Sequence, residues 1–173
     1  MGSSPGRAGS ATDGGVRPVR VALALGSNLG DREATLRWAA GALSAFLDDL
    51  TISSFLETAP VGVDEPQPWY LNAAAAGSTR LGPRPLLAAL QSLERARGRT
   101  RSVPNAARTL DLDLILYGDL VIAEPGLVVP HPRFRERAFV LTPLAEVAGD
   151  MIDPVTALSV KCLAERLRPN PHG

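Results

Sequence analysis

The chain has 173 residues, of which 45% are hydrophobic and 21% charged, so it can form a packed domain and is not expected to be disordered. Lys plus Arg and Asp plus Glu both number 18, and the resulting net charge of +0 argues against nucleic acid or a membrane surface as partner. Cys162 is the only cysteine, which excludes an internal disulfide, and no segment approaches the roughly 20 apolar residues of a membrane helix. We therefore expect a cytoplasmic protein.

Both ends of the chain lack the pattern of a packed element. Residues 1–16 are rich in Gly, Ser and Ala without apolar periodicity, so we expect a disordered tail. Residues 168–173 contain Pro169 and Pro171, which block further helix, and we expect a frayed C-terminus. Residues 17–167 show no repeat and no linker, and they are predicted to form a single domain.

The first half of this domain alternates strand and helix patterns. The predicted elements are a buried strand at 19–25, an amphipathic helix at 31–47, a strand at 51–57, a loop at 59–68, a strand at 70–81 and a helix that begins at 83 or 85. A Gly-rich turn at 26–30 connects the first strand to the first helix and could either cradle a phosphate or simply cap the helix.

The second half begins with a charged loop at 97–107 and a strand at 109–117. Gly118 and Asp119 then predict a hairpin turn into a strand at 120–123. After a loop around His131, helical spacing recurs at 138–147 and 157–167. Mixed strands and helices with an antiparallel hairpin predict an α+β fold, with helices packed on the faces of one mixed or antiparallel sheet.

The strand at 109–117 carries the sharpest chemical feature. Because side chains alternate between the faces of a strand, one face is predicted to be core and the other to carry two carboxylates. The predicted core face holds Leu110, Leu112, Leu114 and Leu116. The other face holds Thr109, Asp111, Asp113, Ile115 and Tyr117.

Two carboxylates on one strand face need compensation. At roughly 5 Å and an effective dielectric near 20, they repel each other by about 3 kcal/mol. Mg²⁺ bound through these carboxylates and substrate phosphates would provide it. Five arginines precede the pair: Arg95, Arg97, Arg99, Arg101 and Arg108. Carboxylates beside guanidinium groups are typical of phosphoryl transfer, although the residues alone leave open a solvated strand face next to a surface loop.

Four segments together resemble a known family. They are Ala-Leu-Gly-Ser-Asn-Leu-Gly-Asp at 24–31, Tyr-Leu-Asn-Ala at 70–73, Arg-Thr-Leu-Asp-Leu-Asp at 108–113 and Val-Pro-His-Pro at 129–132. In this order they resemble the 6-hydroxymethyl-7,8-dihydropterin pyrophosphokinases of folate biosynthesis, over about residues 19–167. The resemblance implies a ferredoxin-like fold and transfer of pyrophosphate from the co-substrate ATP to the pterin hydroxymethyl group, with AMP as the other product. The implied partners are small molecules, and we expect a monomer.

The resemblance also implies roles for individual residues. Asp111 and Asp113 would hold two Mg²⁺ ions, and Arg99 and Arg108 would be the catalytic residues at the phosphates. The implied ATP-binding residues are Gln91, Glu94, Arg99, Arg108, His131 and Arg137. The implied pterin-binding residues are Gly26, Thr58, Val61, Tyr70, Asn72 and Phe139, of which Asn72 would read the ring edge and Phe139 would stack.

The chain also departs from the family pattern. Many members have Trp-Gly-Pro where residues 105–107 read Asn-Ala-Ala, some have an aromatic residue at Pro132, and some have Arg at Gly126. We expect these differences to tune loop closure and ATP affinity. Two alternatives are a Mg²⁺-dependent phosphohydrolase or nuclease, which the net charge disfavours, and a binding protein that has lost catalysis, which the intact acidic pair disfavours.

Overall fold

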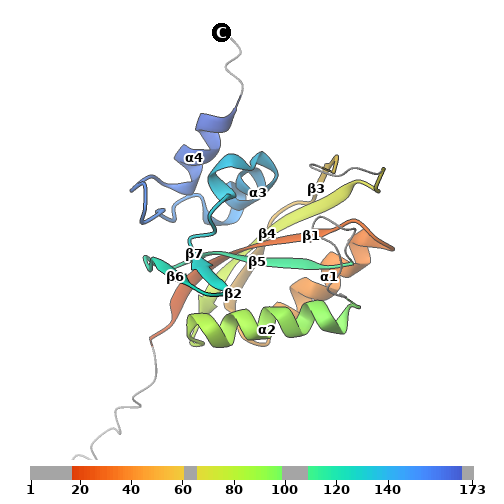
Figure 1. Ribbon diagram of the computed structural model, residues 1–173, viewed down its shortest axis with the longest axis horizontal. Coiled ribbons are helices and arrows are strands. Elements are labelled where there is room, and N and C mark those ends of the chain that lie inside the picture. The colour runs from red at the N-terminus through yellow and green to blue at the C-terminus, as the bar shows by residue number, and fades with distance from the viewer. Residues whose placement is uncertain (1–16, 61–65, 99–108, 169–173) are drawn as a thin grey trace, which may run out of the picture.

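The computed structural model describes residues 17–60, 66–98 and 109–168. Its elements are shown in Figure 1 and are, in order, β1 (Val19–Ser27), α1 (Arg32–Leu43), β2 (Asp48–Ile52), β3 (Leu56–Thr58), β4 (Tyr70–Thr79), α2 (Pro83–Ala96), β5 (Asp111–Tyr117), β6 (Ile122–Glu124), β7 (Leu127–Val129), the 3-10 turn η1 (Phe134–Glu136), α3 (Ala138–Ala148) and α4 (Val160–Leu167). None of the helices in this part of the chain is long and apolar enough to cross a membrane.

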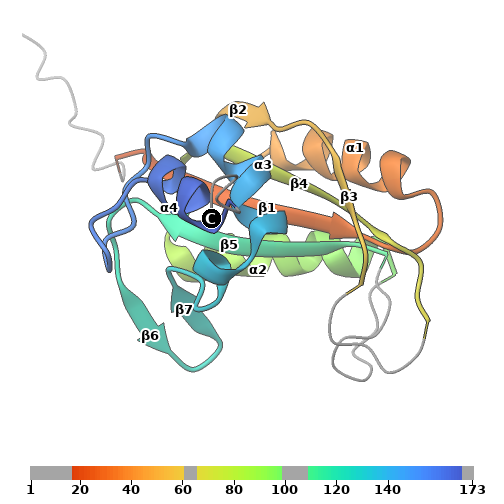
Figure 2. The same cartoon turned by 90° about the horizontal axis from the view of Figure 1, so that it is seen from above.

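The strands form one five-stranded sheet and a separate hairpin. The sheet has the order β2-β4-β1-β5, β3 also pairs with β4, and every pairing is antiparallel. Helices α1 and α2 cover one face, and α3 and α4 cover the other (Figures 1 and 2). The order β1-α1-β2-β4-α2-β5 with this strand arrangement is that of a ferredoxin-like fold, which confirms the predicted α+β class.

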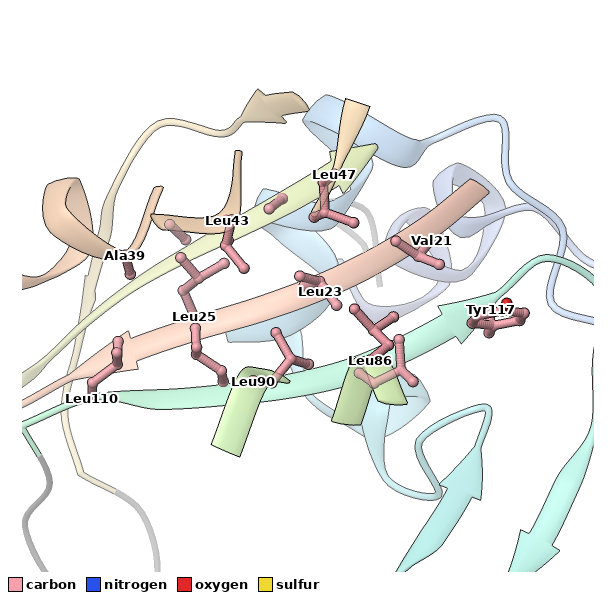
Figure 3. Close-up of a cluster of buried hydrophobic side chains, with 14 of the residues drawn as sticks. Val21, Leu23, Leu25, Ala39, Leu43, Leu47, Leu86, Leu90, Leu110 and Tyr117 are labelled. Atoms are coloured by element: carbon pink, nitrogen blue, oxygen red, sulfur yellow. The ribbon is translucent and has the colours of Figure 1, made fainter. Parts of the chain in front are cut away.

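Each face of the sheet has its own hydrophobic core. β1 lies between β4 and β5 and is buried on both faces, which explains its unbroken apolar run. Val21, Leu23 and Leu25 point into the core beneath α1 and α2 (Figure 3). Ala22 and Ala24 point the other way, toward α3, and these small side chains allow α3 to pack close to the sheet.

A β-bulge in β5 changes part of the predicted face assignment. The residues of β1 that pair with Leu114 and Leu116 are neighbours, so Ile115 is an extra residue on β5. The leucines at and before 114 lie in the core beneath α1 and α2, as predicted. After the bulge the alternation is inverted, so Leu116 joins the core under α3 and Tyr117 the opposite core. The prediction for these last two residues was wrong.

The predicted hairpin at Gly118 and Asp119 is also wrong. These residues form a turn after β5, but the strand that follows, β6, pairs with β7 rather than with β5. Pro125 and Gly126 connect β6 to β7, and Gly126 has a positive φ of 76°. Pro followed by Gly suits the two central positions of a type II turn, so this dipeptide was the overlooked sequence signal.

The strand predicted at 51–57 is divided into β2 and β3 at Ser53. The Ser53 N–H donates to Ala74 O over 2.9 Å, and the Ser53 hydroxyl accepts from the Ala74 N–H over 2.8 Å. The side chain thus replaces a backbone carbonyl, which allows the strand to break without leaving a buried N–H unpaired.

Two helix boundaries differ from the predictions. Helix α1 ends at Leu43 rather than at residue 47, because the N–H groups of residues 44–46 bond to the carbonyls three residues earlier and form turns instead of a further helical turn. Helix α4 begins at Val160 rather than at residue 157, because the Ser159 side chain caps it there.

Candidate active site

The predicted site residues gather at one end of the sheet. β1 ends there and its antiparallel neighbours β4 and β5 begin there, so Gly26 pairs with Asn72 on one side and with Asp111 on the other. On the α3 side of this end lies a cavity of about 700 Å³. Nine predicted site residues line it: Gly26, Thr58, Tyr70, Asn72, Asp111, Asp113, His131, Arg137 and Phe139.

Asp111 and Asp113 supply the cavity with two carboxylates on the face opposite the leucines of β5, as predicted. Their partners on β1 are Gly26 and Ala24, so no side chain larger than a methyl group stands beside them on that strand. The described residues contain no group of three or more side chains that could hold a metal ion by themselves. Mg²⁺ commonly binds through one or two carboxylates, waters and substrate phosphates, and the oxygen donors here fit that coordination.

Gly26 forms part of the cavity floor between an amide and an aromatic ring. A Cβ atom at Gly26 would lie 3.7 Å from Asn72 Oδ1 and 3.7 Å from Tyr70 Cδ1. The Asn72 Nδ2 donates to Leu56 O over 3.1 Å and to Thr58 Oγ1 over 2.8 Å, which uses both amide hydrogens. Oδ1 is therefore oriented toward Gly26 as an acceptor, which suits the N–H edge of a flat heterocycle.

His131 is oriented by two backbone hydrogen bonds. Its N–H donates to Ile115 O over 3.0 Å, and its Nδ1 accepts from the Arg133 N–H over 3.2 Å. Burial lowers the pKa of His131, and the charge of Arg137 lowers it further, although Asp111 opposes the shift. The lowered pKa favours the neutral ring, and because Nδ1 accepts a hydrogen bond, the proton of that ring lies on Nε2, which can donate to an anionic oxygen.

The segment between β7 and α3 contributes two cavity residues that the sequence reasoning missed, Arg133 and Glu136. The available signal was the density of charge directly after His131, where four of the residues 133–137 are charged. Arg137 also lines the cavity, and its Cζ lies 5.6 Å from the ring centroid of Phe139. Two guanidinium groups thus line the same cavity as the carboxylates of β5.

Gln91 and Glu94 do not line this cavity, because α2 packs on the other face of the sheet. Glu94 is only 2% exposed, and its carboxylate accepts from the Leu112 N–H over 3.3 Å. Leu112 lies between the two aspartates on an edge strand, so Glu94 supports the backbone that carries them. The predicted residues Val61, Arg99 and Arg108 and the segment 105–107 lie outside the described residues.

Asn28 and Arg32, for which the sequence predicted no role in the site, support the segment before β4. Asn28 is fully buried, and its Nδ2 donates to Gln67 Oε1 over 3.2 Å and to Pro68 O over 3.3 Å. Arg32 donates to Trp69 O over 2.7 Å. The turn after β1 therefore holds the segment that leads into the cavity residues of β4.

Comparison with known proteins identifies relatives over most of the domain. The model of the family described as 7,8-dihydro-6-hydroxymethylpterin-pyrophosphokinase matches residues 22–149. The Bacillus subtilis 2-amino-4-hydroxy-6-hydroxymethyldihydropteridine pyrophosphokinase is 46% identical over 137 residues, which cover 78% of this chain and 81% of that protein. The Arabidopsis thaliana mitochondrial folate synthesis bifunctional protein is 42% identical over 145 residues, but these cover 83% of this chain and only 26% of that protein.

Similar folds also occur among solved structures. Wild-type Plasmodium falciparum HPPK-DHPS, crystallised with pterin and p-hydroxybenzoate, has a TM-score of 0.67 at 14% identity and is matched over 87% of this chain and 42% of its own. Such low identity supports the fold alone. The chain thus spans about a quarter of the bifunctional relatives and less than half of these structures. The family match over residues 22–149, together with the Bacillus subtilis relative, shows that the chain belongs to the 7,8-dihydro-6-hydroxymethylpterin-pyrophosphokinase family.

Proposed function

We propose that this chain transfers a diphosphoryl group from ATP to the hydroxymethyl group of 6-hydroxymethyl-7,8-dihydropterin, a step of folate biosynthesis. The observation that carries the proposal is a single cavity that joins a slot for a flat heterocycle to a charged end with two carboxylates and two guanidinium groups. The name of the Bacillus subtilis relative describes the same activity for that protein.

The pterin ring would occupy the slot above Gly26. Its N–H edge would donate to Asn72 Oδ1, which is fixed by the bonds of the amide to Leu56 and Thr58. The rings of Tyr70 and Phe139 line the same cavity and would flank the heterocycle. These contacts would place the hydroxymethyl oxygen toward the carboxylates of β5.

The phosphates of ATP would occupy the charged end. Asp111 and Asp113 would hold Mg²⁺, with two ions expected, and the metal would neutralise phosphate charge and polarise the transferred group. The His131 Nε2–H and the Arg137 guanidinium would donate to phosphate oxygens. Arg99 and Arg108 remain the proposed catalytic residues for the charge that develops during transfer.

In the proposed reaction the hydroxymethyl oxygen attacks the β-phosphorus of ATP in line. A bond forms between that oxygen and Pβ, while the bond from Pβ to the oxygen bridging to Pα breaks. AMP leaves with the bridging oxygen, and the hydroxyl proton passes to solvent. The protein contributes mainly positioning and charge stabilisation, which is sufficient for phosphoryl transfer.

The test is to incubate the purified chain with ATP and 6-hydroxymethyl-7,8-dihydropterin, with and without Mg²⁺, and to quantify nucleotides and pterins chromatographically. We expect equimolar AMP and pterin diphosphate only with Mg²⁺. ADP or phosphate with unchanged pterin would instead support the phosphohydrolase. Pterin binding without any nucleotide turnover would support the binding protein that has lost catalysis.

A further inference from the structure

The segment at 131–137 carries cavity residues although it has little regular structure. It connects β7 to α3 and contains only the short turn η1. Arg133, Glu136 and Arg137 face the cavity, whereas Phe134 and Arg135 do not. The side chains that face away from the cavity are therefore the ones that can hold the segment in place.

Phe134 and Arg135 are both anchored. Phe134 is fully buried in the core under α3. The Arg135 guanidinium donates two hydrogen bonds to the Asp153 carboxylate, from Nε to Oδ2 over 2.6 Å and from Nη2 to Oδ1 over 2.8 Å. Two parallel bonds fix the direction of a guanidinium as well as its distance.

Asp153 is itself immobilised. It is 0% exposed, and its Oδ1 also accepts from the Val155 N–H over 3.0 Å. Its Oδ2 accepts from the Thr156 hydroxyl over 2.7 Å. The carboxylate is thus held by the turn before α4, and this turn becomes a fixed support for the segment at 131–137.

We propose that Arg135 and Asp153 are positioning residues for nucleotide binding: their partly buried ion pair holds the segment so that Arg133 and Arg137 present their guanidinium groups to the ATP phosphates. The proposal rests on the proposed function and names a pair outside the cavity. Burying an ion pair adds little net stability compared with an apolar pair, because desolvation offsets the attraction. Its bidentate geometry does restrict orientation, which is the property that a preorganised phosphate site requires.

The test compares Asp153→Asn, Arg135→Gln and Arg135→Lys with the wild type. The matched control is Asp150→Asn, which removes another Arg–Asp pair, the exposed 2.6 Å contact with Arg20, away from the cavity. For each protein the KM for ATP, the KM for the pterin, the Kd of a non-hydrolysable Mg²⁺–ATP analogue and the melting temperature are measured.

We expect Asp153→Asn and Arg135→Gln to raise the KM for ATP and the Kd of the analogue about tenfold, as is typical for losing charge-assisted contacts. The KM for the pterin should stay within about twofold, because most of its slot lies on β1, β3 and β4 and only Phe139, in α3, follows the segment. Arg135→Lys retains the charge but loses the fork, so it should fall between Arg135→Gln and the wild type. Asp150→Asn should match the wild type.

Unchanged nucleotide affinity with a lower melting temperature, or equal increases in both KM values, would overturn the proposal, since the pair would then be only structural. If Asp153→Asn does not fold, Arg135→Lys, which retains a bond to Asp153, decides the question by the same measurements. Failure of the proposed function is a separate outcome: it fails if the wild type makes no AMP from ATP and the pterin. In that case the Kd values of the ATP analogue still show whether Arg135 and Asp153 affect nucleotide binding. A wild type that does not bind the analogue at all overturns both.

Discussion

Gly26 and the aspartates of β5 show how single residues define the two ends of the cavity. Gly26 leaves open the space that a side chain would fill, between Asn72 and the ring of Tyr70. On its other side it pairs with Asp111, so the heterocycle slot and the carboxylates are adjacent positions of one sheet. Changes at these residues should therefore separate binding of the pterin from chemistry at the phosphates.

Gly26→Ala should weaken pterin binding without disturbing the fold. The new methyl group would meet its neighbours at 3.7 Å, an ordinary van der Waals contact, but it would occupy the floor of the slot. One carbon atom in a tight pocket changes discrimination by about tenfold or more, so the KM for the pterin should rise by that factor. Steady-state kinetics check this, and a larger rise in the KM for ATP would place the pterin elsewhere.

Asp113→Asn should abolish most transfer while the protein remains folded. Loss of one carboxylate removes a Mg²⁺ ligand and charge stabilisation, for which a fall in kcat of at least about a hundredfold is expected. The exposed Asp119, in the turn at the other end of β5, provides the control Asp119→Asn. Near-normal turnover of Asp113→Asn at saturating Mg²⁺ would remove Asp113 from the proposed metal site.

At the scale of elements, the β-bulge at Ile115 determines how the end of β5 packs. The bulge at Ile115 rotates the end of β5, so that Tyr117 reaches the opposite core and its hydroxyl donates to Leu81 O over 2.7 Å. The Ile115 carbonyl accepts the His131 N–H. The same irregularity therefore completes one core and anchors the histidine of the cavity.

Two glycines should respond in opposite ways to replacement by alanine. Gly126→Ala places a Cβ at a φ of 76° in the hairpin turn and should lower the free energy of unfolding by about 1 kcal/mol. Gly41→Ala lies on the exposed side of α1 with no atom near the new Cβ, and should raise it by roughly 0.5–1 kcal/mol. Urea denaturation measures both, and equal effects would contradict the assigned turn.

At the scale of the whole molecule, Asp153 links the segment at 131–137 to the turn before α4. Burial alone would raise the pKa of Asp153, but hydrogen bonds from Arg135 and from its own turn outweigh burial, so its pKa lies below the ordinary value. The folded state therefore binds a proton at this carboxylate less readily than the unfolded chain does. Its ionised form stabilises the fold.

The sign of the pH effect follows directly. The stabilisation by Asp153 is complete above the unfolded pKa of about 4 and is lost as the pH falls through the lower folded pKa. Below about pH 4, the free energy of unfolding should thus fall more steeply for the wild type than for Asp153→Asn. Denaturant titrations at a series of pH values measure this, and identical slopes would show that Asp153 does not titrate below its ordinary range.

Much of the site could be predicted from the chain because it depends on local pattern. Alternation along β5 placed Asp111 and Asp113 together, and the resemblance brought Asn72 and Phe139 to the same pocket. Gln91 and Glu94 were predicted near ATP from their position in the family pattern. Neither lines the cavity, because α2 covers the other face of the sheet, and their proximity to ATP stays a prediction.

The sequence by itself determined the α+β class, the buried first strand, the paired carboxylates and the family, because these follow from periodicity and from short motifs. Only the tertiary structure decided that β5 contains a bulge, that β6 pairs with β7 and that Arg135 meets Asp153. Each of these depends on strand register or on contacts between segments separated along the chain. Neither is encoded in the spacing of residues within one element.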